Sequence, residues 1–169
     1  MDLTKDSTPK IISKLSTKYE IEFDITVSSR VGLTSTKYAN VFHIATQEAQ
    51  GDEETGTRIP AVFVNDKYFR FCCGPFDCAN SDEYELNKLY HFRIFQDESD
   101  FKIRHVNYKL YNTTNPTPRD YENVFLYLSD KWSESFTNNG LISNLRITDL
   151  TTCPDLNPQL GVKDSKTLL

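Results

Sequence analysis

The first residues with the potential for chemistry are three carboxylates in the stretch YEIEFDITV. Glu20, Glu22 and Asp24 occupy every second position of that stretch. Because successive side chains of a β-strand point to opposite faces, all three would share one face, and glycosidases can present a pair of carboxyl groups in this way. The alternate positions are apolar, so we interpret the acidic face as the outer surface of a strand. The chain has only one tryptophan to form sugar subsites, so no glycosidase is predicted.

Histidine-based catalysis has equally little support. His43 stands between Phe42 and Ile44 and, by alternation, points with Val41 and Ala45. We interpret it as a hydrogen-bonded, half-buried residue. No nucleophile-elbow motif is present, and the six glycines are scattered singly, which excludes a glycine-rich phosphate loop. We therefore expect the chain not to be an enzyme.

Calcium is the metal that the sequence favours, because hard cations need several oxygen ligands and two expected loops are acidic. GDEETG covers 51–56 and DCANSDEYE covers 77–85. Their spacing matches no EF-hand, and an acidic run is often only a solvated loop. Calcium is thus an optional ligand of a chain that requires no cofactor. The candidate calcium ligands are Asp52, Glu53, Glu54, Asp77 and Asp82.

Four cysteines allow two disulfides in several pairings. Cys72 and Cys73 are neighbours, so in a strand they point to opposite faces and only one can enter the core. Cys73 with Cys78 would close a short turn, and Cys72 with Cys153 would tie the C-terminal segment to a sheet. Four free thiols remain an alternative. Zinc is disfavoured, because it would require closer-paired cysteines and a nearby histidine.

The elements that must position these residues read as β-strands. Aromatic residues make up 12% of the chain and methionine occurs once, a composition that favours strands over helices. The eight or nine predicted strands, with short turns and no amphipathic helix, indicate an antiparallel sandwich or barrel. We predict one β-sandwich domain over 1–150, followed by a linker or disordered tail over 151–169. The principal predicted strands cover 19–29, 39–47, 59–66, 68–74, 89–97, 101–112, 123–130 and 141–150.

Charge and hydropathy exclude several classes of function. The net charge is -5 and no basic stripe is present, so nucleic acid is not an expected partner. The apolar runs are too short for membrane insertion, and the N-terminal stretch lacks the apolar region of a secretory signal. Asn112 begins an Asn-Thr-Thr glycosylation sequon. The chain is therefore either intracellular or a domain of a longer secreted precursor.

The order of its segments resembles the laminin-G-like, concanavalin-A-like jelly-roll domains of animal extracellular and adhesion proteins. The similarity extends over roughly residues 10–150, and it departs from the family pattern at Lys131, where proline is usual, and at Thr57, where aspartate is usual. The resemblance implies a two-sheet β-sandwich with a non-catalytic binding role. Some such domains bind calcium or glycans at the rim, and others bind proteins. The segments that carry the resemblance are YEIEFDITV, NVFHIAT, GTRIPAVFV, ELNKLYHFRIFQ, NTTNPTPRDYENVFLYLSDKW and GLISNLRI.

Arg58 and Asp130 fall at recurrent positions of that family pattern. A guanidinium can hold a carboxylate through two hydrogen bonds, so we expect Arg58 to pair with Asp130 or another acidic loop residue and to close one end of the sandwich. The alternative is that Arg58 faces outward and binds an anionic ligand. Trp132, with Phe136, is either a rim residue that caps the core or an exposed platform for a sugar.

The expected function is recognition or adhesion at the cell surface or outside the cell, as part of a larger secreted precursor. The partner would be an extracellular protein or a glycan, bound through rim loops or a sheet face, and a homo-oligomer is an additional expectation. The alternatives are a lectin, with or without calcium, and, least favoured, a glycoside-active enzyme of the same fold.

Overall fold

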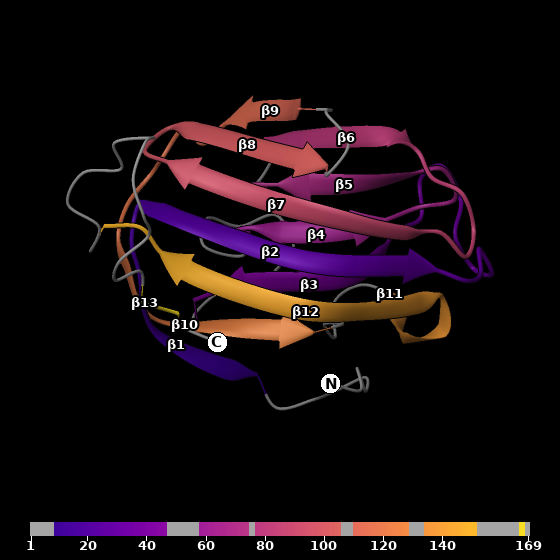
Figure 1. Cartoon of the computed structure of the whole chain (residues 1–169), viewed down its shortest axis with the longest axis horizontal. Helices are drawn as coiled ribbons and strands as arrows, with labels where there is room; N and C mark the ends of the chain where they lie inside the picture. Colours follow the sequence, from indigo (N-terminus) through magenta and orange to yellow (C-terminus); the bar gives the residue numbers. More distant parts are fainter. Residues whose placement is uncertain are drawn as a thin grey trace, which may run out of the picture.

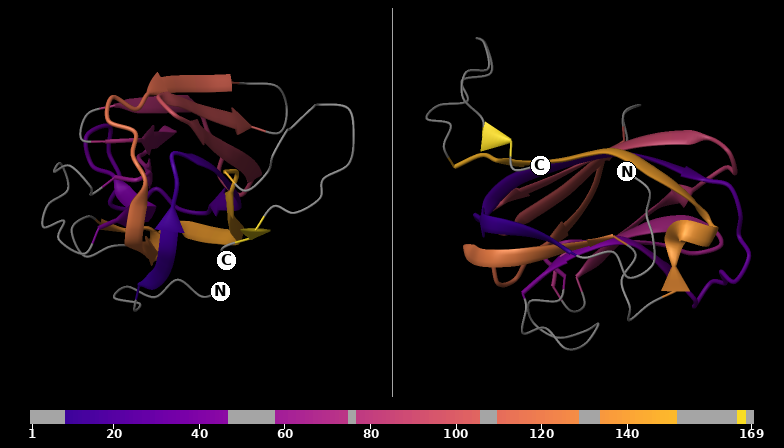
Figure 2. Two further views of the ribbon diagram at one scale, coloured as in Figure 1. Left: turned by 90° about the vertical axis from the view of Figure 1, so that its left-hand side faces the viewer. Right: turned by 90° about the horizontal axis from the view of Figure 1, so that it is seen from below.

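The computed structural model of the protein describes residues 9–46, 58–74, 77–105, 110–128, 134–151 and 166–167. Within these ranges the chain is almost entirely β-strand, and two sheets pack face to face as a sandwich (Figures 1 and 2). The predicted all-β antiparallel sandwich is confirmed. In the same ranges, no helix is both long and apolar enough to cross a bilayer.

Sheet A lies behind sheet B in the view of Figure 1. It is antiparallel except for the two-residue β11 (Glu134–Ser135), which pairs in parallel with β3. Its strands follow the order β1 (Lys10–Leu15), β10 (Tyr121–Leu128), β3 (Ala39–Ala45), β4 (Ala61–Val64), β5 (Tyr68–Cys72) and β6 (Cys78–Glu83).

Sheet B is antiparallel throughout its described strands. The two-residue strand at its edge falls within the predicted tail and pairs with the last residues of β12. Residues 152–165 lie outside the described ranges, so the domain boundary at 150 stays a prediction. The strands follow the order β13 (Lys166–Thr167), β12 (Gly140–Asp149), β2 (Lys18–Val27), β7 (Leu89–Asp97), β8 (Asp100–His105) and β9 (Leu110–Thr114).

Strand β2 shows how alternation builds the core. Its odd-numbered residues are buried from Tyr19 to Val27, and the residues between them are half-exposed. Aromatic rings then connect the sheets: Phe23 of β2 meets Phe42 of β3 edge to face, with the ring centroids 5.1 Å apart. Such a pair contributes about 0.5–1.5 kcal/mol beyond its buried area, so it helps to fix one sheet against the other.

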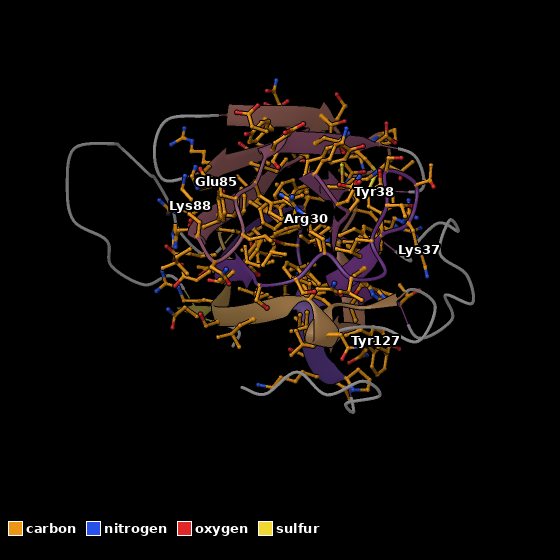
Figure 3. All side chains as sticks on the ribbon, turned by 90° about the vertical axis from the view of Figure 1, so that its right-hand side faces the viewer. Arg30, Lys37, Tyr38, Glu85, Lys88 and Tyr127 are labelled. Atoms are coloured by element: carbon orange, nitrogen blue, oxygen red, sulfur yellow. A yellow bond between two sulfur atoms is a disulfide. The ribbon has the colours of Figure 1, made fainter. Side chains whose placement is uncertain are left out.

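An arginine closes one end of the sandwich. The guanidinium of Arg30 lies 5.0 Å from the centroid of the Tyr84 ring, and its Nη2 donates to the Tyr84 carbonyl at 3.0 Å. Asn139 donates its side-chain amide to the carbonyls of Ser29 and Val31 at 3.1 and 2.9 Å. Figure 3 looks onto this end, with Arg30 near its centre. These contacts join the β2–β3 connection to the segments before β7 and β12.

Two predicted elements differ from the structure. The single strand expected over 101–112 is instead the pair β8 and β9, which run antiparallel to each other. That stretch contains no glycine or proline to signal the reversal. The acidic loop expected over 77–85 contains the edge strand β6. Edge strands carry polar residues that discourage pairing with other chains, and such a strand lacks the apolar alternation used for prediction.

Candidate functional site

The acidic face predicted on β2 exists, but its carboxylates are paired. β2 lies between β12 and β7, so side chains from both neighbours reach it. Arg93 of β7 forms an ion pair with Glu20, and Arg146 of β12 forms one with Glu22. These side chains connect three adjacent strands across the outer face of sheet B.

His91 completes this network. Its Nδ1 lies 2.6 Å from Asp24 Oδ1, and its Nε2 lies 3.2 Å from Glu22 Oε1. Asn144 sits at a β-bulge in β12 with a φ of 53° and donates its amide to Asp24 Oδ2 at 2.6 Å. An asparagine tolerates this left-handed conformation better than most residues.

The network sets the charge of its carboxylates. Partial burial acts to raise the pKa of Glu22 and of Asp24. Hydrogen bonds from Arg146 to Glu22 and from Asn144 and His91 to Asp24, with the nearby positive charges, outweigh it and lower both pKa values. Both groups are therefore ionised at neutral pH, whereas a general acid needs a raised pKa. This arrangement fits a structural clamp across the sheet.

The outer face of sheet A carries aromatic side chains and an arginine around β5. On β5 the core residues Phe69 and Phe71 alternate with outward-facing Tyr68 and Arg70. The register places Arg70 opposite Phe63 of β4 on one side and opposite Asn80 of β6 on the other. Facing residues of an antiparallel pair have their Cβ atoms about 4.5–5.5 Å apart, so these three form one row across the sheet.

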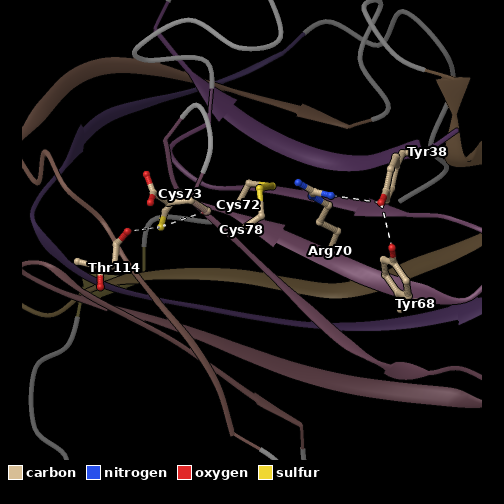
Figure 4. Close-up of a disulfide and its surroundings, with 8 residues drawn as sticks. Tyr38, Tyr68, Arg70, Cys72, Cys73, Cys78 and Thr114 are labelled. Atoms are coloured by element: carbon tan, nitrogen blue, oxygen red, sulfur yellow. Dashed lines mark hydrogen bonds between the residues drawn. A yellow bond between two sulfur atoms is a disulfide. The ribbon is translucent and has the colours of Figure 1, made fainter. Parts of the chain in front are cut away.

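Tyr38 joins this row from the segment just before β3. Its hydroxyl accepts a hydrogen bond from Arg70 Nη1 at 3.3 Å and lies 3.3 Å from the Tyr68 hydroxyl (Figure 4). The guanidinium carbon of Arg70 is 5.4 Å from the centroid of the Tyr38 ring. We call Tyr38, Tyr68, Arg70 and Asn80 the candidate site. The first three are half-buried and Asn80 is exposed.

The chemistry of the candidate site is that of hydrogen bonding and stacking. The hydrogen bond with Tyr38, and then burial, raise the pKa of Tyr68, so its phenol remains protonated at neutral pH. Among the carboxylates that the structure describes, none forms an ion pair with Arg70; Glu83, opposite Tyr68 at the end of β6, is the neighbour on this face by register. Phenol rings, hydroxyls, an amide and a guanidinium therefore occupy one area of the sheet.

A disulfide fixes the two strands that carry most of this site. Cys72 of β5 is bonded to Cys78 of β6 (Figure 4). This corrects both predicted pairings, Cys73 with Cys78 and Cys72 with Cys153. The register places Cys72 directly opposite Cys78 on the outer face, whereas Cys73 points into the core, as the alternation argument requires. Cys153 lies outside the described residues.

Cys73 keeps its thiol on the core side. Its Sγ lies 3.7 Å from the carbonyl oxygens of Asp77 and Thr114. Burial, with the charge of Asp77 adding to it, raises the pKa of this thiol to about 12. The thiolate is the reactive form of cysteine, so Cys73 is inert at neutral pH.

Arg58 lies on the same face as the candidate site. Its guanidinium carbon is 5.3 Å from the centroid of Phe63, the residue opposite Arg70, and its carbonyl accepts from the Gly74 amide at 2.8 Å. Asp130, its predicted partner, and Trp132 fall outside the described residues. Phe136, the predicted companion of Trp132, is fully buried in the core and cannot form an exposed sugar platform.

Only two of the five candidate calcium ligands, Asp77 and Asp82, fall within the described ranges. Asp77 stands immediately before β6, and Asp82 is exposed on β6 with its backbone amide donating to the Tyr111 hydroxyl at 3.0 Å. In the described ranges, no group of three or more histidine, cysteine, aspartate or glutamate side chains could hold a metal ion. Asp52, Glu53 and Glu54 lie outside those ranges, so calcium stays a prediction for them.

The remaining predicted residues are placed as follows. His43 lies on the outer face of sheet A, is more buried than expected and stacks on Tyr127 with the centroids 4.8 Å apart. The prediction that it shares a face with Val41 is wrong, because a bulge between Asn40 and Phe42 turns Val41 into the core. Asn112 is exposed on β9, as a glycosylation site requires.

All four members of the candidate site were missed by sequence reasoning. The available signal was the alternation of YFRF, in which Tyr68 and Arg70 must share the face opposite to Phe69 and Phe71. Tyr38 and Asn80 gave no such signal, because their proximity depends on the order of the strands in sheet A.

Comparison with known proteins identifies the fold. No protein-family model matches the chain, and no curated protein matches its sequence. The structure is similar to alginate lyase AlgAT5 from Polysaccharide Lyase family 7, with a TM-score of 0.51 and 14% identity over 80% of this chain and 62% of the lyase. It is also similar to a sialidase, with a TM-score of 0.51 and 12% identity over 80% of this chain and 14% of the sialidase. This chain therefore spans less than two-thirds of each of these proteins.

The alginate lyase from Corynebacterium sp. gives a TM-score of 0.50 at 12% identity over 80% of this chain and 61% of the lyase. At such identities, likeness shows the fold alone. The jelly-roll β-sandwich implied by the sequence resemblance is confirmed, whereas a laminin-G-like relationship stays a prediction.

These structures correct the prediction that the chain is not an enzyme. That prediction depended in part on a fold expected to serve non-catalytic binding, yet the alginate lyases and the sialidase that share the fold are enzymes. The prediction that this chain is not an enzyme is therefore wrong, because a fold that is shared with enzymes gives no ground for excluding catalysis.

Proposed function

We propose that the protein binds a glycan at the candidate site on the outer face of sheet A. The observation that carries the proposal is the convergence of Tyr38, Tyr68, Arg70 and Asn80 on one half-exposed area of the sheet. Sugars present C–H faces that pack on aromatic rings and hydroxyls that need hydrogen-bond partners. Tyrosine supplies both an apolar ring and a polar end, and the amide and guanidinium supply further donors.

The contrast between the two sheets supports this choice of face. On sheet B the charged side chains are matched to one another across β12, β2 and β7. On sheet A the described polar groups of the candidate site face outward beside aromatic rings, which is the arrangement of a few placed polar groups among apolar ones that ligand sites use. The solved structures with this fold include alginate lyases and a sialidase, which is consistent with a glycan as the partner.

Secretion is part of the proposal. The Cys72–Cys78 disulfide supports an oxidising compartment, since disulfides persist mainly in extracellular and secreted proteins. An adhesion role, an extracellular protein partner and self-association stay predictions beside the glycan. Calcium also stays a prediction, and a chelator in the binding assay tests it.

The test is a glycan array followed by titration of the best ligand against the wild-type chain and Tyr68→Ala. Loss of a central interface tyrosine can cost 2 kcal/mol or more, so we expect the affinity to fall by at least about tenfold. Phe95→Ala is the matched control, because Phe95 is a half-buried aromatic residue on the outer face of sheet B. It should leave the affinity unchanged.

Two results would contradict the proposal: no glycan is bound with or without calcium, or Tyr68→Ala binds as tightly as wild type. The mass of each bound glycan, measured before and after incubation, shows in the same experiment whether the sugar chain is cleaved.

A further inference from the structure

We infer that the glycan bound by this protein carries carboxylate groups, and that Arg70 receives one of them. The inference depends on the proposed function, because it assigns the class of sugar and the residue that selects it. Candidate ligands are oligosaccharides with uronic-acid or sialic-acid units, as opposed to neutral sugars of the same length.

The first argument is the state of the Arg70 guanidinium. Arginine has five N–H donors, and the structure gives one of them to the Tyr38 hydroxyl at 3.3 Å. No described carboxylate forms an ion pair with Arg70, although this side chain is half-buried between Phe63 and Asn80. A planar fork with donors left to use binds a carboxylate through two parallel hydrogen bonds.

The second argument is that the fork is held in place before a ligand arrives. The Tyr38 ring lies 5.4 Å from the guanidinium carbon, and the same residue accepts the Nη1 hydrogen bond. The Cys72–Cys78 disulfide lies two residues along each strand from Arg70 and Asn80 and holds β5 against β6. A side chain already ordered loses less entropy on binding, so the affinity for a matching anion increases.

The third argument is the contrast with sheet B. There, each described arginine of the β2 network forms an ion pair with a glutamate. Arg70 forms no ion pair with a described carboxylate and gives one donor to a neutral phenol. Its guanidinium is therefore the better placed of these arginines to receive a carboxylate from a ligand.

The experiment compares pairs of oligosaccharides that differ only in charge. Each acidic oligosaccharide, from a panel of oligouronates and sialylated glycans, is titrated beside the same molecule after reduction of its carboxyl groups to alcohols. The wild-type chain, Arg70→Gln, Arg70→Lys and the control Arg104→Gln are used. Arg104 is a matched control because its guanidinium lies 5.5 Å from the Phe95 ring on the outer face of sheet B.

We expect the wild type to bind the acidic member of at least one pair more tightly than the reduced member. Arg70→Gln should weaken binding of the acidic member by about tenfold to a hundredfold, because a charge-assisted hydrogen bond is lost. Its binding of the reduced member should be unchanged. Arg70→Lys should fall between wild type and Arg70→Gln, and Arg104→Gln should behave as wild type.

Equal binding of both members by the wild type, or equal loss of both in Arg70→Gln, would overturn the assignment of a carboxylate while leaving glycan binding intact. If Arg104→Gln reproduces the loss, general surface charge explains the preference and the assignment to Arg70 is wrong. If neither member of any pair binds while the glycan array identifies another ligand, the inference fails and the proposed function stands. If no glycan on the array binds either, both fail. Circular dichroism of each variant confirms that it is folded.

Discussion

Tyr38 contributes two separate groups to Arg70, a ring face and a hydroxyl acceptor. The two contacts together restrict the guanidinium more than either would alone. An arginine held against a ring and a hydroxyl in this way has its remaining N–H donors available for a ligand. This is the residue-scale reason to treat Arg70 as a recognition residue and not only as a surface charge.

Alternation within a strand predicted several side-chain directions correctly. It placed Cys72 and Cys73 on opposite faces, because these directions depend only on the local backbone. It was wrong to place Val41 on the face of His43, because the strand is irregular between Asn40 and Phe42. It could not identify the partner of Cys72, or place Tyr38 beside Arg70. Those facts depend on which strands are neighbours and in which register, and neither is encoded within a single segment.

Asn112 gives a prediction at the level of one residue. It is exposed on β9 and begins a glycosylation sequon, so the enzyme that attaches N-linked glycans can reach it once the chain enters a secretory pathway. We expect the chain secreted from eukaryotic cells to lose mass on treatment with an N-glycosidase. Asn112→Gln should remove that shift. Secretion of an unmodified wild-type chain would contradict the prediction.

Strands β5 and β6 form an element in which a covalent bond and a binding surface coincide. The disulfide closes a loop of six residues in the sequence, and closing so short a loop stabilises a fold by about 2 kcal/mol in the chain-entropy model. We predict that the double variant Cys72→Ser/Cys78→Ser loses about this much free energy of unfolding in urea. We also expect weaker glycan binding, because β6 is the edge strand of sheet A and, among the described strands of that sheet, pairs with β5.

Chemical reduction of the wild-type chain distinguishes loss of the disulfide from other effects of the two serine substitutions. A reducing agent should bring the wild type to the stability of the double variant and leave the variant unchanged. Cys73→Ala, which alters the neighbouring thiol, should retain the full response to reduction. A wild-type chain whose stability is insensitive to reduction would show that the disulfide does not stabilise the fold.

The network centred on β2 explains why an obvious acidic motif need not be a catalytic one. Its three carboxylates share a face as predicted, but β12 and β7 bring cations and an amide to them. The sequence shows the carboxylates because they lie within one strand. It hides their partners, which are roughly 70 and 120 residues away in the chain.

The whole molecule should lose stability in acid, because the lowered pKa values of Glu22, Asp24 and Asp149 differ from those of the unfolded chain. Partial burial acts to raise the pKa of Asp149, and hydrogen bonds from Thr151 and Ser16 outweigh it. Since each folded pKa lies below its unfolded value, the stabilisation is present above the unfolded values, near pH 4, and disappears as the pH falls through the folded values. We predict a steady decrease in the free energy of unfolding between about pH 5 and pH 3.

The double variant Glu22→Gln/Asp24→Asn should be less stable than wild type at pH 7 and should show a shallower decrease in acid. Asp100→Asn, in the exposed β7–β8 hairpin, serves as the control and should retain the wild-type slope. Parallel curves for the double variant and the wild type would mean that these two carboxylates do not determine the acid sensitivity.

At the scale of the whole molecule, the sandwich was predictable and the location of the candidate site was not. Alternation in β2 and β7 is enough to indicate half-buried strands, and many such strands without helices indicate a sandwich. A net charge of -5, however, is an average over two outer faces with different chemistry. Only the strand order shows that the ion pairs lie on sheet B and that the candidate site lies on sheet A.

The strict alternation of β5 has a consequence for how this protein can change over evolutionary time. Phe69 and Phe71 maintain the core, while Tyr68 and Arg70 on the same strand contact none of it and meet the ligand. Substitutions at the outward positions therefore leave the packing of the core residues unchanged. A lineage of such proteins would keep its interior and diversify its sugar preference, and a library randomised at positions 68, 70 and 80 would sample new specificities on an intact scaffold.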